Sequence, residues 1–127
     1  MSLFQQGWYT LHAGGQSSWK IECDALSNDD WDTLAKIVSE RISFSDVVGV
    51  PTGGIRFSNA LQVYANPNSP QLRLLICDDV LTTGTSMEQM REQYKRYSEV
   101  VGVVVFARGK CPDWILPIFQ MWEAAGC

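Results

Sequence analysis

The sequence predicts a single α/β domain built on a parallel, Rossmann-like sheet. Three short apolar runs, at residues 47–50, 72–77 and 100–107, have the length and composition of buried strands. Helical patterns lie between these runs, at residues 54–64 and 86–97. Because strands and helices alternate, we expect parallel strands joined by right-handed crossovers.

A small hairpin is expected before this sheet. Its strands would lie at residues 8–11 and 19–23, on either side of a Gly-Gly pair at residues 14–15. Ser27 or Asn28 then caps a first helix, since both residue types favour that position. The apolar face of this helix consists of Trp31, Leu34, Ala35, Val38 and Ile42.

The helix expected at residues 86–97 begins at a capping box, because Ser86 and Gln89 have the required spacing. Residues 65–70, Ala-Asn-Pro-Asn-Ser-Pro, give the strongest loop signal in the chain. The apolar stripe of the helix consists of Met87, Met90, Tyr94 and Tyr97.

Composition fits one packed domain that covers residues 1–127. The longest apolar run, residues 100–107, is too short to cross a membrane, and no Lys or Arg precedes Lys20 as in a secretory signal. The net charge of −4 gives no support to nucleic-acid binding. Four widely spaced cysteines and one histidine favour neither a zinc site nor a disulfide scaffold, so we expect a reducing, cytoplasmic environment.

The most informative segment is residues 74–86, Leu-Leu-Ile-Cys-Asp-Asp-Val-Leu-Thr-Thr-Gly-Thr-Ser. It reads as a buried strand, two adjacent carboxylates at Asp78 and Asp79, and a hydroxyl-rich loop that opens onto a helix. The N–H groups and helix dipole at residues 82–86 suit a phosphate. The two acids repel phosphate and therefore suit sugar hydroxyls or a hydrated divalent cation. A Walker-type loop needs a Gly-Lys-Ser/Thr ending, which the sequence lacks.

Three polar loops are expected to meet at one edge of the sheet, because the carboxyl ends of parallel strands gather there and bind ligands. The first is residues 51–54, Pro-Thr-Gly-Gly, followed by Arg56. The second is the acidic and hydroxyl-rich segment at residues 78–86, and the third is residues 108–110, Arg-Gly-Lys. Acids, hydroxyls, glycines and cations at one edge are the groups that a phosphorylated sugar needs.

Residues 74–86 resemble the phosphoribosyl-pyrophosphate (PRPP) signature of the type I phosphoribosyltransferases. The resemblance implies the fold of that family and catalytic roles for Asp78 and Asp79, which would bind ribose hydroxyls and contact Mg²⁺ through water or PRPP. It implies 5′-phosphate binding by Thr82, Thr83, Gly84, Thr85 and Ser86. Residues 48–55 resemble the pyrophosphate loop of the family, although Pro-Thr-Gly-Gly is also common in plain turns. The residues implied there are Thr52, Gly53, Gly54 and Arg56.

The N-terminal segment, residues 7–19, resembles the opening of the orotate phosphoribosyltransferase branch, with His12 in place of the expected lysine. In that branch, residues corresponding to 1–26 form a hood over the base. Arg108 resembles the strand-end arginine that contacts the orotate carboxylate, a geometry that a guanidinium suits. The base-binding set implied is His12, Trp19, Lys20 and Arg108. A solvated arginine, a turn histidine and a buried tryptophan remain the alternative interpretations.

One departure from the family concerns the catalytic loop. Type I enzymes carry a long flexible loop before the PRPP signature, and in the orotate branch it delivers a lysine. Residues 61–73 of this chain contain no lysine and no acid, so that lid is missing. Lys20, Arg56 and Lys110 are the cations that could compensate.

Two functions therefore remain open at this stage. The first is a homodimeric transferase that passes the 5-phosphoribosyl group of PRPP to a nucleobase, with orotate favoured, and releases pyrophosphate. The second is a noncatalytic PRPP- or nucleotide-binding module that has kept the phosphate site and lost the lid.

Overall fold

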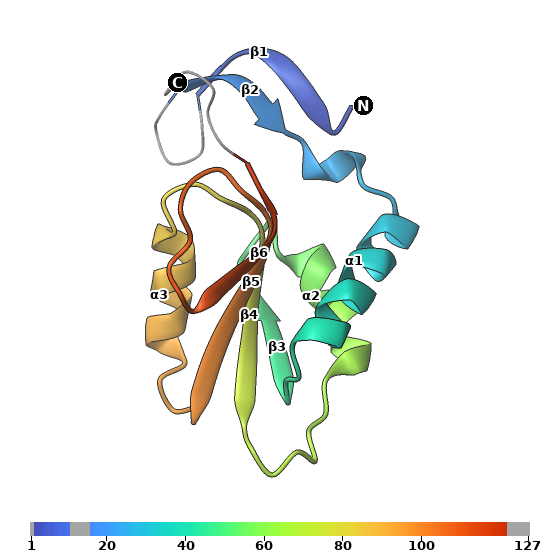
Figure 1. Ribbon diagram of the computed structural model, residues 1–127, viewed down its shortest axis with the longest axis vertical. Helices are drawn as coiled ribbons and strands as arrows, with labels where there is room; N and C mark the ends of the chain where they lie inside the picture. The colour runs from blue at the N-terminus through green and yellow to red at the C-terminus, as the bar shows by residue number, and fades with distance from the viewer. Residues whose placement is uncertain (1, 11–15, 122–127) are drawn as a thin grey trace.

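A four-stranded parallel sheet forms the centre of the structure, a computed structural model that describes residues 2–10 and 16–121. The strand order is β3-β4-β5-β6 (Figure 1). The strands are β3 (Asp46–Gly49), β4 (Arg73–Leu81), β5 (Glu99–Ala107) and β6 (Ile115–Gln120). The predicted α/β fold with a parallel sheet is confirmed.

The helices cover both faces of this sheet (Figure 1). On one face lie α1 (Asn28–Arg41) and α2 (Ile55–Leu61), the latter continued by a short 3₁₀ turn, η2 (Gln62–Tyr64); α3 (Thr85–Gln93) lies on the other. Ser27 caps α1 in a capping box: its hydroxyl accepts from Asp30 N–H at 3.1 Å, and the Asp30 carboxylate accepts from Ser27 N–H at 2.9 Å. This confirms the predicted start of the first helix.

The start of α3 differs from the prediction. Its N-cap is Gly84, in the left-handed region at φ 84°, and not Ser86. The threonine hydroxyls on either side bond to each other, Thr83 Oγ1 to Thr85 Oγ1 at 3.0 Å. The helix also ends at Gln93, four residues before its predicted end, because the chain leaves the helical conformation at Tyr94.

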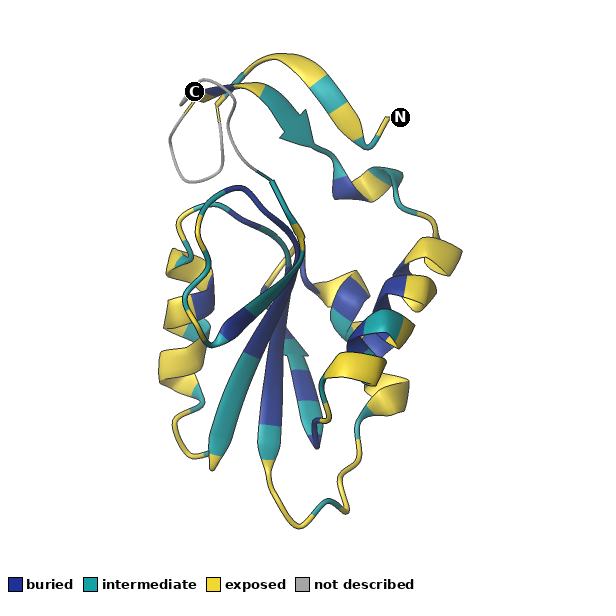
Figure 2. Ribbon diagram, viewed as in Figure 1, coloured by how far each residue is buried: buried dark blue, intermediate teal, exposed yellow. Residues whose placement is uncertain are grey.

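The central strand β4 packs on two separate cores, since neighbouring side chains of a strand point to opposite faces. Leu74 and Ile76 pack on the α3 side with Met87. Leu75 and Cys77 pack on the α1 and α2 side in the larger cluster. All four strand side chains are almost fully buried (Figure 2), and burial raises the pKa of the Cys77 thiol, so this cysteine serves packing.

The two strand–helix–strand units have opposite hands. Strands β3, β4 and β5 follow one another across the sheet, so both crossovers advance in the same direction. Phe57 of α2 packs into one core and Met87 of α3 into the other, which places the two helices on opposite faces. Two crossovers that advance in the same direction over opposite faces cannot both be right-handed, so the expectation of two right-handed crossovers is wrong. The helix of the first unit, α2, packs on the same face of the sheet as α1.

A hairpin of β1 (Phe4–Thr10) and β2 (Gln16–Ile21) stands over the carboxyl ends of the sheet strands (Figure 1). The predicted hairpin is confirmed, with both strands beginning earlier than expected. A 3₁₀ turn, η1 (Cys23–Ala25), leads from it to α1. The Gly-Gly pair and His12 lie outside the described residues.

The end of β4 and the whole of β6 were not predicted from the sequence. Strand β4 continues to Leu81 because its end stays paired with the apolar strand β5, with Asp78 opposite Val104 and Leu81 opposite Ala107. Strand β6 contains Pro117, which normally argues against a strand. The proline is tolerated because β6 lies at the edge of the sheet.

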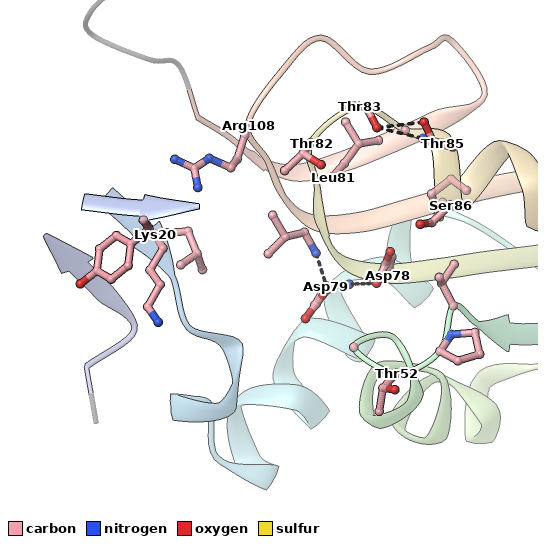
Figure 3. A pocket seen from close by; sticks show the side chains of 18 of the residues that line it. Lys20, Thr52, Asp78, Asp79, Leu81, Thr82, Thr83, Thr85, Ser86 and Arg108 are labelled. Atoms are coloured by element: carbon pink, nitrogen blue, oxygen red, sulfur yellow. Dashed lines mark hydrogen bonds between the residues drawn. The ribbon is translucent and has the colours of Figure 1, made fainter. Parts of the chain in front are cut away.

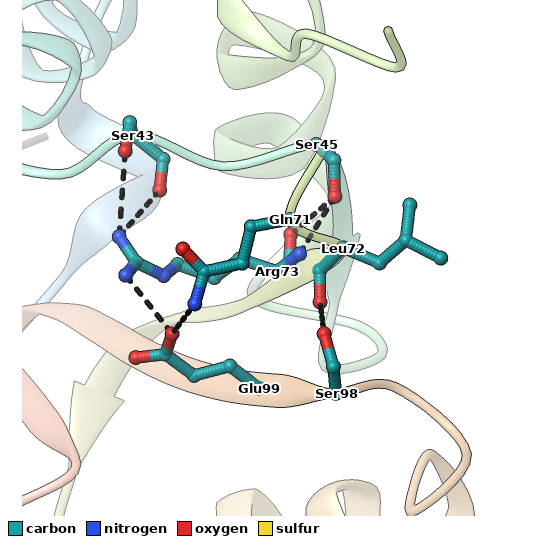
Figure 4. Close-up of polar contacts among 7 residues, drawn as sticks. All are labelled: Ser43, Ser45, Gln71, Leu72, Arg73, Ser98 and Glu99. Atoms are coloured by element: carbon teal, nitrogen blue, oxygen red, sulfur yellow. Dashed lines mark hydrogen bonds and ion pairs between the residues drawn. The ribbon is translucent and has the colours of Figure 1, made fainter. Parts of the chain in front are cut away.

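A polar network joins the amino ends of the strands, at the end of the sheet opposite the hairpin (Figure 4). Arg73 Nη2 donates to Glu99 Oε2 at 2.9 Å, and Arg73 Nη1 donates to the carbonyl oxygen of Ser43 at 3.1 Å. Ser45 Oγ accepts from Arg73 N–H at 2.8 Å. These contacts tie β4 to β5 and to the segment that leads into β3.

Within residues 2–10 and 16–121, none of the helices has the length and apolar character needed to cross a membrane.

We expect Leu61→Ala to lower the free energy of unfolding by about 2–5 kcal/mol, because Leu61 is fully buried between α2 and the sheet and its removal leaves a cavity. Leu72→Ala is the matched control: this leucine is 52% exposed, and we expect a loss of about 0.5 kcal/mol. Urea denaturation measures both. Equal losses would contradict the packing described for α2.

Candidate functional site

An open cleft of about 810 Å³ lies between the carboxyl ends of the strands and the hairpin (Figure 3). Its floor is formed by the end of β4 and the loops that follow β3 and β4, and β1 and β2 form its opposite wall. Two of the three predicted loops therefore meet here, as expected. From the third, Arg108 lines the cleft and Lys110 does not.

The acidic pair lies on β4 itself, at the centre of the cleft (Figure 3). Strand alternation turns Asp78 toward the side of α3 and Asp79 toward the turn that precedes α2. Asp78 is only 9% exposed, and its carboxylate accepts from Asp79 N–H at 2.8 Å. Asp79 Oδ1 in turn accepts from Val80 N–H at 2.7 Å. These backbone contacts fix both carboxyl groups in position.

Burial raises the pKa of Asp78 to about 8, and its hydrogen bond to and repulsion from Asp79 add to the effect. Near neutral pH the pair therefore tends to hold one proton. A neutral Asp78 carboxyl beside Asp79 offers one donor together with several acceptors. Such a pair suits the vicinal hydroxyls of a sugar, each of which both donates and accepts hydrogen bonds.

The loop after β4 brings all its predicted residues to the cleft. The five residues from Thr82 to Ser86 line it, and their side chains supply four hydroxyls. The loop leads directly into α3, whose amino end carries the positive side of the helix dipole. Hydroxyls, backbone N–H groups and a helix start in one loop form a suitable anion site.

The turn after β3 contributes Thr52 and Gly53 to the cleft, and the peptide bond between Pro51 and Thr52 is cis. A Cβ atom at Gly53 would lie 2.5 Å from Asp79 Oδ2, so this position requires glycine for the turn to approach the acid. Gly54 lies below the turn as the N-cap of α2 and does not line the cleft.

Arg56 points away from the predicted pyrophosphate site. Its Nη2 atom donates to the carbonyl oxygen of Leu26 at 3.2 Å and to Asn28 Oδ1 at 3.1 Å. Its guanidinium group lies 5.7 Å from the centroid of the Trp31 ring. In this arrangement Arg56 joins α2 to the start of α1 and lies outside the cleft lining.

Arg108 joins the hairpin to the sheet. It is 7% exposed, and its Nη2 atom donates to Ser17 Oγ at 2.5 Å and to the carbonyl oxygen of Trp19 at 2.9 Å. Its guanidinium carbon lies 3.6 Å from the centroid of the Trp19 ring. Trp19 therefore packs on Arg108 and does not line the cleft. The solvated arginine considered from the sequence is not observed.

The hairpin wall also contains residues that the sequence analysis did not select, namely Tyr9, Thr10 and Ile21. Lys20, which was selected, lies beside them. Tyr9 and Thr10 lie in the hood-like segment that the sequence indicated, whereas Ile21 reaches the cleft only through the fold of the hairpin over the sheet. Within the segment 61–73, where the family carries its lid, the connection from η2 to β4 runs at the opposite end of the sheet (Figure 1).

No protein-family model and no curated protein matches this sequence. Solved structures do. Orotate phosphoribosyltransferase from Aeropyrum pernix matches with a TM-score of 0.72 and 20% identity, over 93% of this chain and 88% of that one. Orotate phosphoribosyltransferase from Mycobacterium tuberculosis gives a TM-score of 0.65 and 16% identity, over 92% and 89% of the two chains.

A purine phosphoribosyltransferase from Pyrococcus horikoshii matches as well, with a TM-score of 0.59 and 18% identity, over 76% of this chain and 87% of that one. At these identities the likeness establishes the fold. The chain has the fold of the type I phosphoribosyltransferases, as its PRPP-like segment predicted.

We expect the protein to lose stability as pH rises from about 4 to about 8. The folded-state pKa of Asp78, about 8, lies above its ordinary value near ~3.9. Between these values the folded state holds a proton that the unfolded state has released, so each step up in pH favours unfolding. Asp78→Asn should flatten this dependence, whereas Asp32→Asn on the exposed face of α1 should not. Urea denaturation at pH 5 and pH 8 checks it; an unchanged slope in Asp78→Asn would contradict it.

We also expect Arg108→Met to release the hairpin from the sheet, because it removes both hydrogen bonds to β2 and the charge on the Trp19 ring. Amide hydrogen exchange in residues 4–10 and 16–21 should rise by about tenfold or more, since each charge-assisted hydrogen bond contributes about 1.5–3 kcal/mol. Arg41→Met, at the end of α1, is the control. Unaltered exchange in the hairpin would show that Arg108 does not hold it.

Proposed function

We propose that this protein is a PRPP-dependent phosphoribosyltransferase that transfers the 5-phosphoribosyl group to a nucleobase and releases pyrophosphate. The observation that carries the proposal is the cleft itself. A hydroxyl-rich anion loop, a pair of acids and a tight glycine turn meet in it, and these groups suit a 5′-phosphate, a ribose and a diphosphate. The shared fold supports the same assignment.

In this mechanism the residues from Thr82 to Ser86 bind the 5′-phosphate and fix the sugar for attack. Asp78 and Asp79 bind the ribose hydroxyls. As the bond to the diphosphate breaks, the sugar ring gains positive charge, which the nearby carboxylate of Asp79 stabilises. A ring nitrogen of the base attacks the anomeric carbon, and Thr52 and Gly53 hold the departing pyrophosphate.

Magnesium fits this cleft as a partner of the substrate. Among the residues described, no group of three His, Cys, Asp or Glu side chains is arranged to hold a metal ion. Asp78 and Asp79 would contact the ion through its bound water or through PRPP, because Mg²⁺ keeps several waters and is held largely by substrate phosphates. The ion would offset the charge of the diphosphate, while the two acids position the hydrated metal.

Orotate is the base that we favour, because the hairpin wall resembles the orotate branch in sequence and two of the similar structures are orotate phosphoribosyltransferases. Arg108 supplies positive charge where this wall meets the sheet, which suits an anionic pyrimidine. Trp19, expected from the sequence to bind the base, packs on Arg108 outside the cleft lining, and His12 lies outside the described residues. A homodimer is the assembly that we propose with it.

A noncatalytic PRPP- or nucleotide-binding module is the second candidate function. One observation favours it: the connection between α2 and β4 runs at the amino ends of the strands, away from the cleft. Within the described residues, the hairpin is the segment that faces the phosphate loop across the cleft. Transferases exclude water from the reacting atoms, and such a module has no need to do so.

We expect pyrophosphate release from Mg–PRPP with one base among orotate, uracil, hypoxanthine, guanine and adenine. Asp79→Asn should lower the rate about 100-fold to 1000-fold, because it removes the charge that stabilises the sugar cation. Asp32→Asn should leave it unchanged. If no base gives release while PRPP still raises the melting temperature, the binding module is the correct function. If PRPP does neither, both candidates are wrong.

A further inference from the structure

The cleft contains few positive charges for a ligand as anionic as PRPP. Among the residues that the structure describes, Lys20 and Arg108 are the basic side chains that line it. Arg108 is committed to Ser17 and to Trp19. The two other candidate cations, Arg56 and Lys110, lie outside the lining. Geometry therefore selects Lys20 from the three cations that the sequence left open.

Lys20 lies on β2, and its side chain extends into the cleft on the side of Asp79 and Thr52 (Figure 3). The ammonium group thus lies on the hairpin wall, across the cleft from the turn that forms the proposed pyrophosphate site (Figure 3). From the hairpin wall, a lysine can contact the diphosphate on one side while the turn binds it from the other side of the cleft.

The contacts of Lys20 are weak enough to exchange. Its Nζ atom lies 3.6 Å from Glu22 Oε2 and 4.8 Å from the centroid of the Tyr9 ring. The two side chains of the ion pair are 35% and 29% exposed, and ion pairs this exposed to solvent contribute little to stability. A diphosphate carries more charge than one carboxylate and would displace Glu22 at little cost.

We propose that Lys20 binds the diphosphate of PRPP and stabilises the pyrophosphate as it leaves. This role rests on the proposed function. The bond between the anomeric carbon and the diphosphate oxygen breaks, and its electron pair passes to that oxygen. The ring nitrogen of the base forms the new bond with its lone pair, and its proton passes to the departing pyrophosphate. Lys20 keeps its own proton throughout and acts through charge and hydrogen bonding.

Calorimetric titration with two ligands tests this role. Mg–PRPP carries the diphosphate, whereas ribose 5-phosphate has the same sugar and 5′-phosphate without it. We expect Lys20→Met to weaken binding of PRPP about 10-fold to 100-fold and to leave binding of ribose 5-phosphate within twofold of the unaltered protein. Lys20→Arg should restore most of the affinity for PRPP. Lys95→Met, an exposed lysine beyond α3, should bind both ligands normally.

The other outcomes separate the two proposals. If Lys20→Met binds PRPP normally, or loses both ligands equally, Lys20 does not hold the diphosphate and the inference is overturned, while the proposed function stands. If Lys110→Met loses PRPP and Lys20→Met does not, the cation is Lys110. If the unaltered protein binds neither ligand, the proposed function itself fails.

Discussion

The rest of the structure depends on the burial of β4 on both faces. Its apolar half alternates between two cores, so the register of the strand cannot shift by one residue without exposing one set and burying the wrong one. The same alternation continues into Asp78 and Asp79. The packing of Leu75 and Ile76 therefore determines which acid faces α3 and which faces the turn before α2. The faces on which the apolar side chains of β4 pack therefore fix the faces toward which its two acids point.

Much of the fold could be predicted because local patterns agree with their tertiary setting. The capping box at Ser27 and the apolar runs of the inner strands are sufficient signals by themselves. The start of α3 was misassigned because two signals compete there: Ser86 has a capping spacing, but Gly84 alone accepts a left-handed backbone. Strand β6 was missed because Pro117 is acceptable only at a sheet edge, and a single sequence does not reveal which strand forms the edge.

The candidate site divides in the same way. Residues at or just after the carboxyl end of a strand, such as Asp79 and Thr83, could be placed from the topology alone. The orientation of a long side chain could not. Arg56 and Arg108 both stand at the correct edge, yet one turns toward the start of α1 and the other toward β2. An arginine side chain turns toward the hydrogen-bond acceptors that lie near it in the folded structure. Those acceptors belong to segments distant in sequence, so their positions cannot be predicted from the sequence.

The hairpin covers the cleft at the carboxyl ends of the strands and forms one of its walls. Closing a phosphate site requires a segment that crosses the carboxyl ends of the strands, and the connection before β4 lies at the other end. The hairpin occupies the required place, and Arg108, almost fully buried, fastens it there through Ser17 and Trp19. Because the hairpin is anchored at this point, the side chain next to the anchor keeps a fixed position relative to the floor of the cleft. Lys20, next in sequence to Trp19, is that side chain, so Arg108 fixes the wall and Lys20, beside its contact, faces the cleft.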